Sequence, residues 1–501
     1  MTQTCSSRQK TGILGLDNIL GGGFPASSVY LVQGDPGVGK TTLCLQFLLE
    51  GVRAGETCLY VTLSESAAEL KAIAASHGWS LEGLHVQELS AADTGLGPDD
   101  ENTLFHPAEI ELGERIQQIV ETADRIRPTR IVIDSCSELR LLAQTALRFR
   151  RQILALKQHL VVQRHSTLLL LDNASARGDD QVLLQSLAHG VISMEQTIPE
   201  FGMERRRLVV LKLRGVRFRG GYHDFVIATG GLKVFPRLIA AEHVTEFAPD
   251  VVLSGVPEFD LLLGGGLTRG SSTLLVGPAG TGKSALGLQY AVAAAARGEH
   301  SAVFLFDESR FTTLTRSKSL GLDLEPHLQS GRLTLRQVDP AEMSPGEFSH
   351  DVRKMVESSG TRVVVLDSLN GYHQAMPNVD FLIAQLHELL TFLGQQGVLT
   401  MLLMAQHGLL GDEMLSPIDV SYLADTVVVL RYFEASGSIR KAVSVVKRRI
   451  GVHEDTIREF KLTSRGIRIG QPLRDFRGVL GGVPEYKGSA DRSGPLMMDK
   501  E

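Results

Sequence analysis

Short apolar runs alternate along the chain with stretches whose apolar residues recur at helical spacing. The runs lie at residues 29–33, 58–63, 130–134, 167–171 and 191–195, and again at 272–276, 302–306, 362–367, 398–404 and 426–430. Runs that are apolar throughout are typical of parallel strands buried on both faces. Strands alternating with helices therefore predict an α/β fold with mostly parallel, twisted sheets flanked by helices.

The whole pattern occurs twice. A lead-in from Thr11 to Gly23, with Asp17 and three glycines, returns from Ser254 to Gly266 with Asp260, at an offset of 243 residues (254 − 11). A chain of 501 residues is too long for one ordinary core. We predict two tandem domains, residues 1–241 and 242–484, and a disordered tail at 485–501 because its composition is polar.

A phosphate-binding loop follows each lead-in, between an apolar strand and a predicted helix. The pattern G-x-x-x-x-G-K-[ST] lets backbone N–H groups surround phosphates, while its lysine reaches the terminal oxygens. Two such loops in the same setting predict two ATP sites. Their residues are Gly34, Asp35, Pro36, Gly37, Val38, Gly39, Lys40, Thr41 and Thr42 in the first, and Gly277, Pro278, Ala279, Gly280, Thr281, Gly282, Lys283, Ser284 and Ala285 in the second.

Acidic residues follow the strands that should lie beside each loop. Asp134 and Asp367 end apolar runs as Walker B residues do, so they are expected to hold Mg²⁺ with the hydroxyls of Thr41 and Ser284. Glu65 and Glu308, again 243 residues apart (308 − 65), stand where a base could activate water. The alternatives are a solvated acid near a helix start for Glu65 and a strand-end turn for the aspartates.

Each half ends in a basic strand that carries the pair Lys212 and Arg214 or the pair Lys447 and Arg449. In a ring of subunits these cations would reach a neighbour's terminal phosphate and assist catalysis there. Basic residues on an edge strand also serve simply to prevent aggregation. A local strip at residues 205–219 adds further arginines, for which nucleotide contact and subunit pairing are favoured over nucleic acid.

Composition narrows the class of protein. A net charge of −6 argues against a chain-wide nucleic-acid surface, and hydrophobic content of 43% indicates a globular protein. The sequence has neither a long uninterrupted apolar run nor an apolar N-terminal stretch, so we expect a cytoplasmic location and no membrane. The cysteines lack metal-ligand spacing.

These motifs together resemble the double-domain KaiC-type ATPases of the RecA/DnaB-like group of P-loop proteins. The resemblance covers nearly the whole chain and includes the lead-ins, both loops, the segments ending in Asp134 and Asp367, and Leu211-Lys-Leu-Arg-Gly215. It implies a homohexamer that binds ATP and Mg²⁺ at subunit interfaces, where Lys212, Arg214, Lys447 and Arg449 contact the neighbour's nucleotide. Glu65 and Glu308 match one of the two adjacent glutamates of the family.

The resemblance also implies a phosphorylation site. Clock-type members modify adjacent Ser and Thr residues in the second domain, where this chain has Ser421 and Tyr422. Ser421 is therefore the candidate for serine autokinase and autophosphatase activity, and the alternative is a structural hydroxyl at the start of a strand. A KaiB-like partner on the first domain is a candidate, whereas the tail after Pro484 offers little helix to a KaiA-like one.

Three functions remain open at this point. The leading hypothesis is an ATPase that works as a regulatory switch. A DNA-dependent ATPase of the recombinase or helicase kind would share the fold, but the segments after Asp134 and Asp367 are not basic. A scaffold held together by bound nucleotide, with negligible turnover, is the third.

Overall fold

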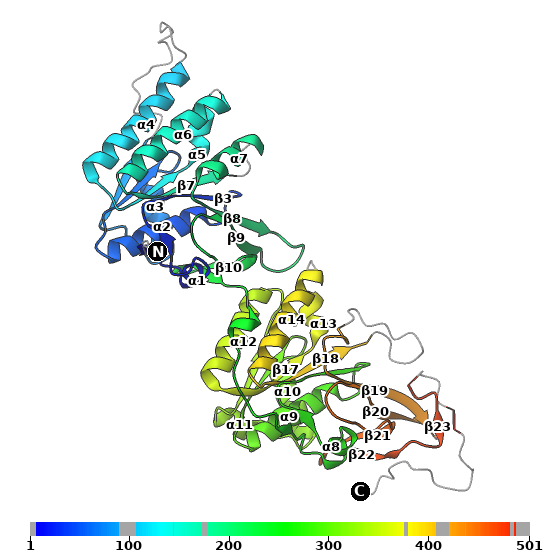
Figure 1. Ribbon diagram of the computed structural model, residues 1–501. Helices are drawn as coiled ribbons and strands as arrows, with labels where there is room; N and C mark the ends of the chain where they lie inside the picture. Colours follow the sequence, from blue (N-terminus) through cyan, green and yellow to red (C-terminus); the bar gives the residue numbers. More distant parts are fainter. Residues whose placement is uncertain are drawn as a thin grey trace, which may run out of the picture. The chain divides into compact units, whose positions relative to one another are not determined.

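The computed structural model describes residues 7–89, 107–143, 145–172, 178–374, 379–406, 420–435, 437–480 and 485–486. The chain divides into two compact units, Met1–Arg237 and Leu238–Glu501. The division lies a few residues before the boundary expected from the sequence. Figure 1 shows in each unit a twisted sheet with helices on both of its faces.

The first unit is built around a nine-stranded sheet. Its strands are β3 (Val29–Gly34), β4 (Cys58–Thr62), β5 (Leu84–Glu88), β6 (Arg130–Asp134), β7 (Ser166–Asp172), β8 (Gly190–Thr197), β9 (Arg205–Leu213), β10 (Tyr222–Ala228) and β11 (Gly231–Phe235), with a separate pair β1 (Arg8–Gln9) and β2 (Phe24–Pro25). Its helices are α1 (Leu14–Ile19), α2 (Lys40–Arg53), α3 (Ala67–Ser76), α4 (Pro107–Ile126), α5 (Cys136–Leu142), α6 (Ala146–Val162) and α7 (Gly178–Leu187).

The second unit repeats this plan. Its nine-stranded sheet consists of β14 (Ser272–Gly277), β15 (His300–Leu305), β16 (Leu333–Gln337), β17 (Thr361–Asp367), β18 (Leu399–Ala405), β19 (Thr426–Ala435), β20 (Ser438–Arg448), β21 (Arg458–Thr463) and β22 (Gly466–Pro472). Its other elements are η2 (Ala240–Glu242), α8 (Pro257–Leu262), α9 (Lys283–Ala296), α10 (Arg310–Ser319), α11 (Glu325–Gln329), α12 (Pro345–Ser359), α13 (Leu369–Gln374), α14 (Val379–Gln395) and the short pairs β12 (Val251–Val252) with β13 (Leu267–Thr268) and β23 (Phe476–Arg477) with β24 (Glu485–Tyr486).

The two sheets have the same topology. The order is β11-β10-β9-β8-β3-β7-β6-β4-β5 in the first and, read from the same edge, β22-β21-β20-β19-β14-β18-β17-β15-β16 in the second. In each, the strands from β8 to β5 or from β19 to β16 are parallel, and the remaining three are antiparallel. The predicted tandem α/β fold is therefore confirmed.

Side chains of the central strands supply a core on each face of the sheet. In the first unit Val32 and Val132 pack in a cluster with residues of α2, while Leu31 and Ile133 pack in another with residues of α6. Successive residues of a strand point to opposite faces, which is why strands buried on both sides read as unbroken apolar runs.

The repeated lead-ins are closed by their aspartates. Asp17 Oδ1 accepts hydrogen bonds from the backbone N and the hydroxyl of Thr11, both at 2.8 Å, and Asp260 Oδ1 accepts one from Ser254 N at 2.9 Å. The shared Thr/Ser and Asp residues of the two lead-ins thus have a structural role.

The expected tail begins with two described residues. Glu485–Tyr486 pair with β23, and the ring of Tyr486 lies 5.3 Å from that of Phe476. The first two residues of the expected tail thus form the short strand β24, and residues 487–501 lie outside the described part of the chain. Among the described residues no helix is both long and apolar enough to cross a bilayer.

Candidate nucleotide sites

The first phosphate-binding loop connects the buried end of β3 to α2. Gly37 and Gly39 have φ angles of 80° and 109°, in the left-handed region that glycine adopts most readily. Helix α2 begins at Lys40 and has no side-chain cap, so the N–H groups of its first turn are available to an anion. The backbone therefore fits a phosphate group.

Lys40 is buried, with 7% of its surface exposed. Its Nζ donates to the carbonyl oxygens of Gly34 at 3.0 Å and Asp35 at 2.9 Å, and lies 2.5 Å from Asp172 Oδ1. Asp172 is the last residue of β7, beside Gly34 in the sheet. The sequence interpretation missed this acid.

The predicted magnesium ligands of the first site are together. Thr41 Oγ1 donates to Asp134 Oδ2 at 3.2 Å, and the hydroxyl of Tyr60 donates to the same oxygen at 2.5 Å. Burial raises the pKa of Asp134, against the hydrogen bonds from Tyr60 and Thr41. Thr41 and Asp134 are both oxygen donors, as Mg²⁺ prefers, and Mg²⁺ sites commonly use one or two protein ligands together with substrate phosphates.

Glu65 follows β4, the strand that pairs with β6. Two hydrogen bonds to Thr62 fix the backbone of Glu65. Glu65 N donates to Thr62 Oγ1 at 3.0 Å, and Thr62 Oγ1 donates to the Glu65 carbonyl at 2.7 Å. Its Oε2 is buried without a hydrogen-bond partner in the described part of the chain. Burial raises the pKa of Glu65, and the charges of Asp134 and Glu69 raise it further.

The second loop has the same backbone. Gly280 and Gly282 have φ angles of 77° and 110°, and α9 begins at Lys283 without a side-chain cap. Lys283 Nζ donates to the carbonyls of Gly277 and Pro278, each at 2.7 Å. Burial lowers the pKa of Lys283 to about 8, although the charge of Asp367 opposes this shift.

The predicted metal ligands of the second site also meet. Asp367 accepts a hydrogen bond from the Ser284 side chain. Burial raises the pKa of Asp367, the Ser284 bond and the charge of Arg316 lower it, and the charges of Glu308 and Asp307 raise it. Asp307 accepts a hydrogen bond from the hydroxyl of Ser368, so it too lies beside the Walker B strand.

Glu308 is held by side chains of α10. Arg316 Nη1 donates to Glu308 Oε1 at 2.9 Å, and Arg316 Nη2 lies 2.8 Å from Oε2 without the alignment of a hydrogen bond. Thr313 Oγ1 donates to Oε2 at 3.1 Å. The sequence interpretation did not select Arg316, whose counterpart 243 residues earlier is Ile73 (316 − 73).

Comparison with known proteins identifies the family of this chain. A family model of the KaiC ATPase matches residues 9–239 and 252–474. The chain belongs to the KaiC ATPase family. A circadian clock oscillator protein KaiC from Thermostichus vulcanus is 27% identical over 479 residues, which cover 95% of this chain and 91% of the relative. One from Parasynechococcus marenigrum is 27% identical over 497 residues, covering 98% and 96%. A circadian clock protein KaiC3 from Synechocystis is 25% identical over 490 residues, covering 96% and 95%.

The basic pairs of this KaiC-family chain lie at the other end of each sheet from the phosphate loop. Lys212 pairs with Val191 near the start of β8, whereas Gly34 pairs with Met194 further along the same strand. Lys212 Nζ donates to Gln185 O at 2.5 Å, and Arg214 Nη2 donates to Ser186 O at 3.2 Å. The structure thus does not bring this pair to the loop of its own unit.

A third cation joins the first pair. Lys157 Nζ donates to Leu187 O at 2.7 Å, so Lys157, Lys212 and Arg214 all bind carbonyls at the C-terminal end of α7. Cations are favoured there by the helix dipole. Burial lowers the pKa of Lys212, and the charges of Arg214 and Lys157 lower it further.

The second pair holds the turn that contains Ser421. Lys447 Nζ donates to Ser421 O at 2.7 Å and to Ala424 O at 2.8 Å. Arg449 Nη2 donates to Tyr422 O at 2.6 Å, and Arg449 Nη1 lies 3.6 Å from Asp425 Oδ1. The candidate phosphorylation site and the basic pair are therefore neighbours, as Gln185 and the first pair are.

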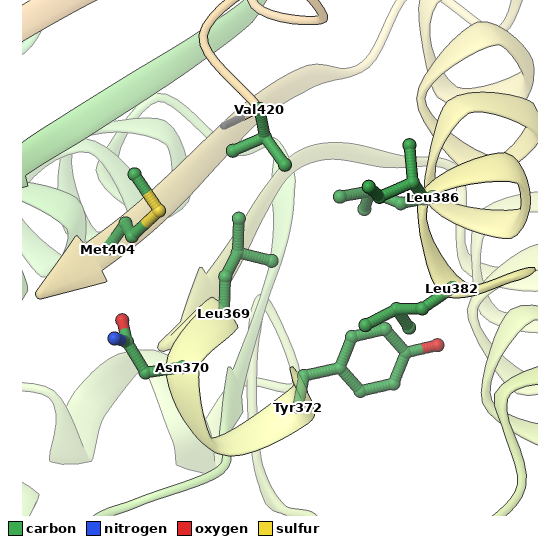
Figure 2. A pocket seen from close by; sticks show the side chains of 8 residues that line it. Leu369, Asn370, Tyr372, Leu382, Leu386, Met404 and Val420 are labelled. Atoms are coloured by element: carbon green, nitrogen blue, oxygen red, sulfur yellow. The ribbon is translucent and has the colours of Figure 1, made fainter. Parts of the chain in front are cut away.

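An apolar pocket of the second unit is lined in part by α13, the helix that follows its Walker B strand. Figure 2 shows side chains from α13, α14, β18 and the segment before β19 around it. They belong to Leu369, Asn370, Tyr372, Leu382, Ile383, Leu386, Met404 and Val420. The Asn370 amide is bound to the backbone of Ala405, since Nδ2 donates to its O at 2.8 Å and Oδ1 accepts from its N at 2.7 Å. An apolar lining does not suit phosphate, so this pocket is not part of the nucleotide site.

Proposed function

We propose that this KaiC-family ATPase hydrolyses ATP at both phosphate loops and uses the cycle as a regulatory switch. The proposal rests on the same arrangement of residues in both units. In each unit a buried loop lysine, an uncapped helix start and a hydroxyl bonded to a strand-end aspartate lie together. Phosphoryl transfer depends on such positioning and charge neutralisation.

Residues of the chain would divide the work as follows. Lys40 and Lys283 would bind the terminal phosphates, and the helix starts would donate their N–H groups. Thr41 with Asp134, and Ser284 with Asp367, would hold Mg²⁺, which neutralises charge on the phosphate oxygens when bound. Asp134 and Asp367 are hydrogen-bonded to these hydroxyls, which supports the assignment of each pair as ligands of one ion.

Glu65 would act as the base of the first site. Its Oε2 has no hydrogen-bond partner among the described residues, so it is available to accept a proton from water. Its raised pKa brings it closer to neutrality, where a general base works best. Glu308 would have the same role in the second site after release from Arg316.

The paired substitution tests this assignment. Glu65→Gln together with Glu308→Gln should lower ATP turnover of the full chain by about 10² or more, because general-base catalysis commonly contributes that factor. Phosphate release at saturating Mg²⁺ and ATP is the measurement. A double variant that hydrolyses ATP at the parent rate would remove both residues from the mechanism.

The basic pairs would complete the site of a neighbouring subunit in a homohexamer. They lie too far along the sheet to serve their own loop, since Lys212 pairs with Val191 near the start of β8 and Gly34 pairs with Met194 further along that strand. A cation supplied by a neighbour contributes about 10³ to 10⁵ in rate in P-loop enzymes that use one. The particle mass with and without ATP tests the ring, and a monomer with bound ATP would contradict it.

Ser421 would be the acceptor of autophosphorylation in this ring. Its carbonyl is bound by Lys447, so a neighbour's phosphate drawn to the basic pair would also approach Ser421. Incubation with ATP and mapping of phosphosites tests this step. Hydrolysis without phosphate on Ser421 would leave a switch that works by ATP turnover alone, and turnover stimulated by DNA and suppressed by salt would favour a recombinase-like function instead.

A further inference from the structure

Asp172 lies beside Lys40, the residue expected to bind the terminal phosphates in the first site. A lysine ammonium has three N–H donors. In the first unit these face three acceptors, the carbonyls of Gly34 and Asp35 and the carboxylate of Asp172. The side chains of Lys40 and Asp172 are 8% and 26% exposed, so water screens their attraction only in part.

The second unit provides a natural comparison. Ala405 pairs with Gly277 as Asp172 pairs with Gly34, so the two residues occupy one position of the repeated sheet. Lys283 Nζ donates to two carbonyls, and within the described residues no third acceptor faces it. One of its donors is thus available to a ligand, whereas Lys40 has none to spare.

Both positions are fixed by the same kind of contact. The backbone N of Asp172 donates to Ser137 Oγ at 3.0 Å, and that of Ala405 donates to Asn370 Oδ1 at 2.7 Å. Ser137 lies in α5 and Asn370 lies in α13, the helices that follow the two Walker B strands. The difference between the sites therefore comes from the side chain at this position and not from the backbone.

We propose that Asp172 is an internal competitor of the nucleotide's terminal phosphates for Lys40, and that the first site binds ATP more weakly for this reason. Phosphate must displace the carboxylate from Lys40 before it can take the third donor. The displaced carboxylate also adds negative charge near the phosphates, since the charge of Asp172 already raises the pKa of Asp134. This inference deepens the proposed function and rests on it.

Equilibrium binding to the full chain tests the proposal. The probe is a fluorescent, non-hydrolysable ATP analogue with Mg²⁺, and Lys283→Ala serves as the background so that the first site dominates the signal. Asp172→Asn keeps the size of the side chain and removes its charge. It should tighten binding by up to about fivefold, the upper scale for an ion pair with a partly exposed member. Glu121→Gln, an exposed acid on α4, controls for the loss of one negative charge and should leave binding unchanged.

The reciprocal change is made in the second site. Ala405→Asp in a Lys40→Ala background should weaken binding by up to about fivefold, because it places a carboxylate beside Lys283. Unchanged or weaker binding by Asp172→Asn, in a variant whose thermal unfolding matches its background, would overturn the proposal. If Asp172→Asn does not fold, unchanged or tighter binding by Ala405→Asp overturns it. A parent chain that binds no analogue would instead overturn the nucleotide sites themselves.

Discussion

The two nucleotide sites have the same backbone arrangement, but an ion pair restrains a cation in the first and a carboxylate in the second. In the first, Lys40 is paired with Asp172, while Glu65 keeps a buried oxygen without a partner among the described residues. In the second, Ala405 leaves Lys283 without such a carboxylate, while Arg316 holds Glu308. The first site thus has its phosphate-binding cation restrained, and the second has its proposed base restrained.

A repeated fold can therefore support two different sites through very few side chains. The restraint in the first site comes from Asp172, where the second unit has Ala405. The restraint in the second site comes from Arg316, where the first unit has Ile73. Each is a single ion pair with at least one partly exposed member, and such pairs contribute little enough that ligand binding can break them. The difference predicts a first site limited by binding and a second site limited by chemistry.

The largest expected effect is on how much of the total ATP hydrolysis each site contributes. Glu65→Gln alone should lower total ATP hydrolysis to the level of the second site, because the unrestrained base is lost and such a base contributes about 10² or more at its own site. Glu308→Gln alone should remove the smaller share, because Glu308 is already held by Arg316. Phosphate release at saturating ATP measures both, and a larger loss from Glu308→Gln would reverse the comparison.

A smaller effect is expected when the restraint on Glu308 is removed. Arg316→Ala in a Glu65→Gln background should raise second-site turnover by about fivefold, roughly what breaking one partly exposed ion pair provides. Arg310→Ala is the matched control, since Arg310 is exposed on the same helix. A fall in turnover with Arg316→Ala, but not with Arg310→Ala, would instead identify Arg316 as a group that positions Glu308 for the reaction.

The fold and half of each site could be predicted from the sequence because their signals are local. Loop spacing gave Lys40 and Lys283, and an acid after an apolar run gave Asp134, which the structure places beside Thr41. The same rule would have found Asp172, but the predicted strand ended at Leu171, one residue short of β7.

The remaining parts depend on contacts that spacing does not reveal. Tyr60 lies inside an apolar strand and looked like a core residue, yet its hydroxyl reaches Asp134 at the end of the neighbouring strand. Arg316 reaches back from α10 to Glu308, which precedes that helix. Aligning the two halves of the sequence places Ile73 opposite Arg316, and this difference could have drawn attention to Arg316.

Acid should loosen the antiparallel edge of the first unit before that of the second. His223 pairs with Leu208, and Arg458 pairs with Val443 at the matching place of the second sheet. His223 is 1% exposed, its Nδ1 accepts from Arg237 N at 2.9 Å, and its Nε2 lies 3.0 Å from the carbonyl of Arg219. Burial lowers the pKa of His223 to about 4, against the Arg219 hydrogen bond and with the charges of Arg219 and Arg237.

Proton uptake by the unfolded chain lowers the stability of the first unit in acid. Between about pH 6.5 and pH 4 the unfolded chain protonates this histidine and the folded chain does not, so the free energy of unfolding falls by up to about 3 kcal/mol. Arg458 instead pairs with Glu454 at 2.7 Å. Burial opposes the shift, but hydrogen bonds from Thr456 and Arg458 hold the pKa of Glu454 below its usual value, so that pair is lost only at lower pH.

Hydrogen exchange at about pH 5 should therefore show lost protection in β10 and β11 while β21 and β22 keep theirs. His223→Gln removes the titrating group and should abolish the pH dependence of this difference, even though the variant is less stable at neutral pH. Parallel loss in both edges would mean that neutral His223 is not what distinguishes them. The acid sensitivity would then belong to the shared backbone, and the contrast between the units would be confined to their nucleotide sites.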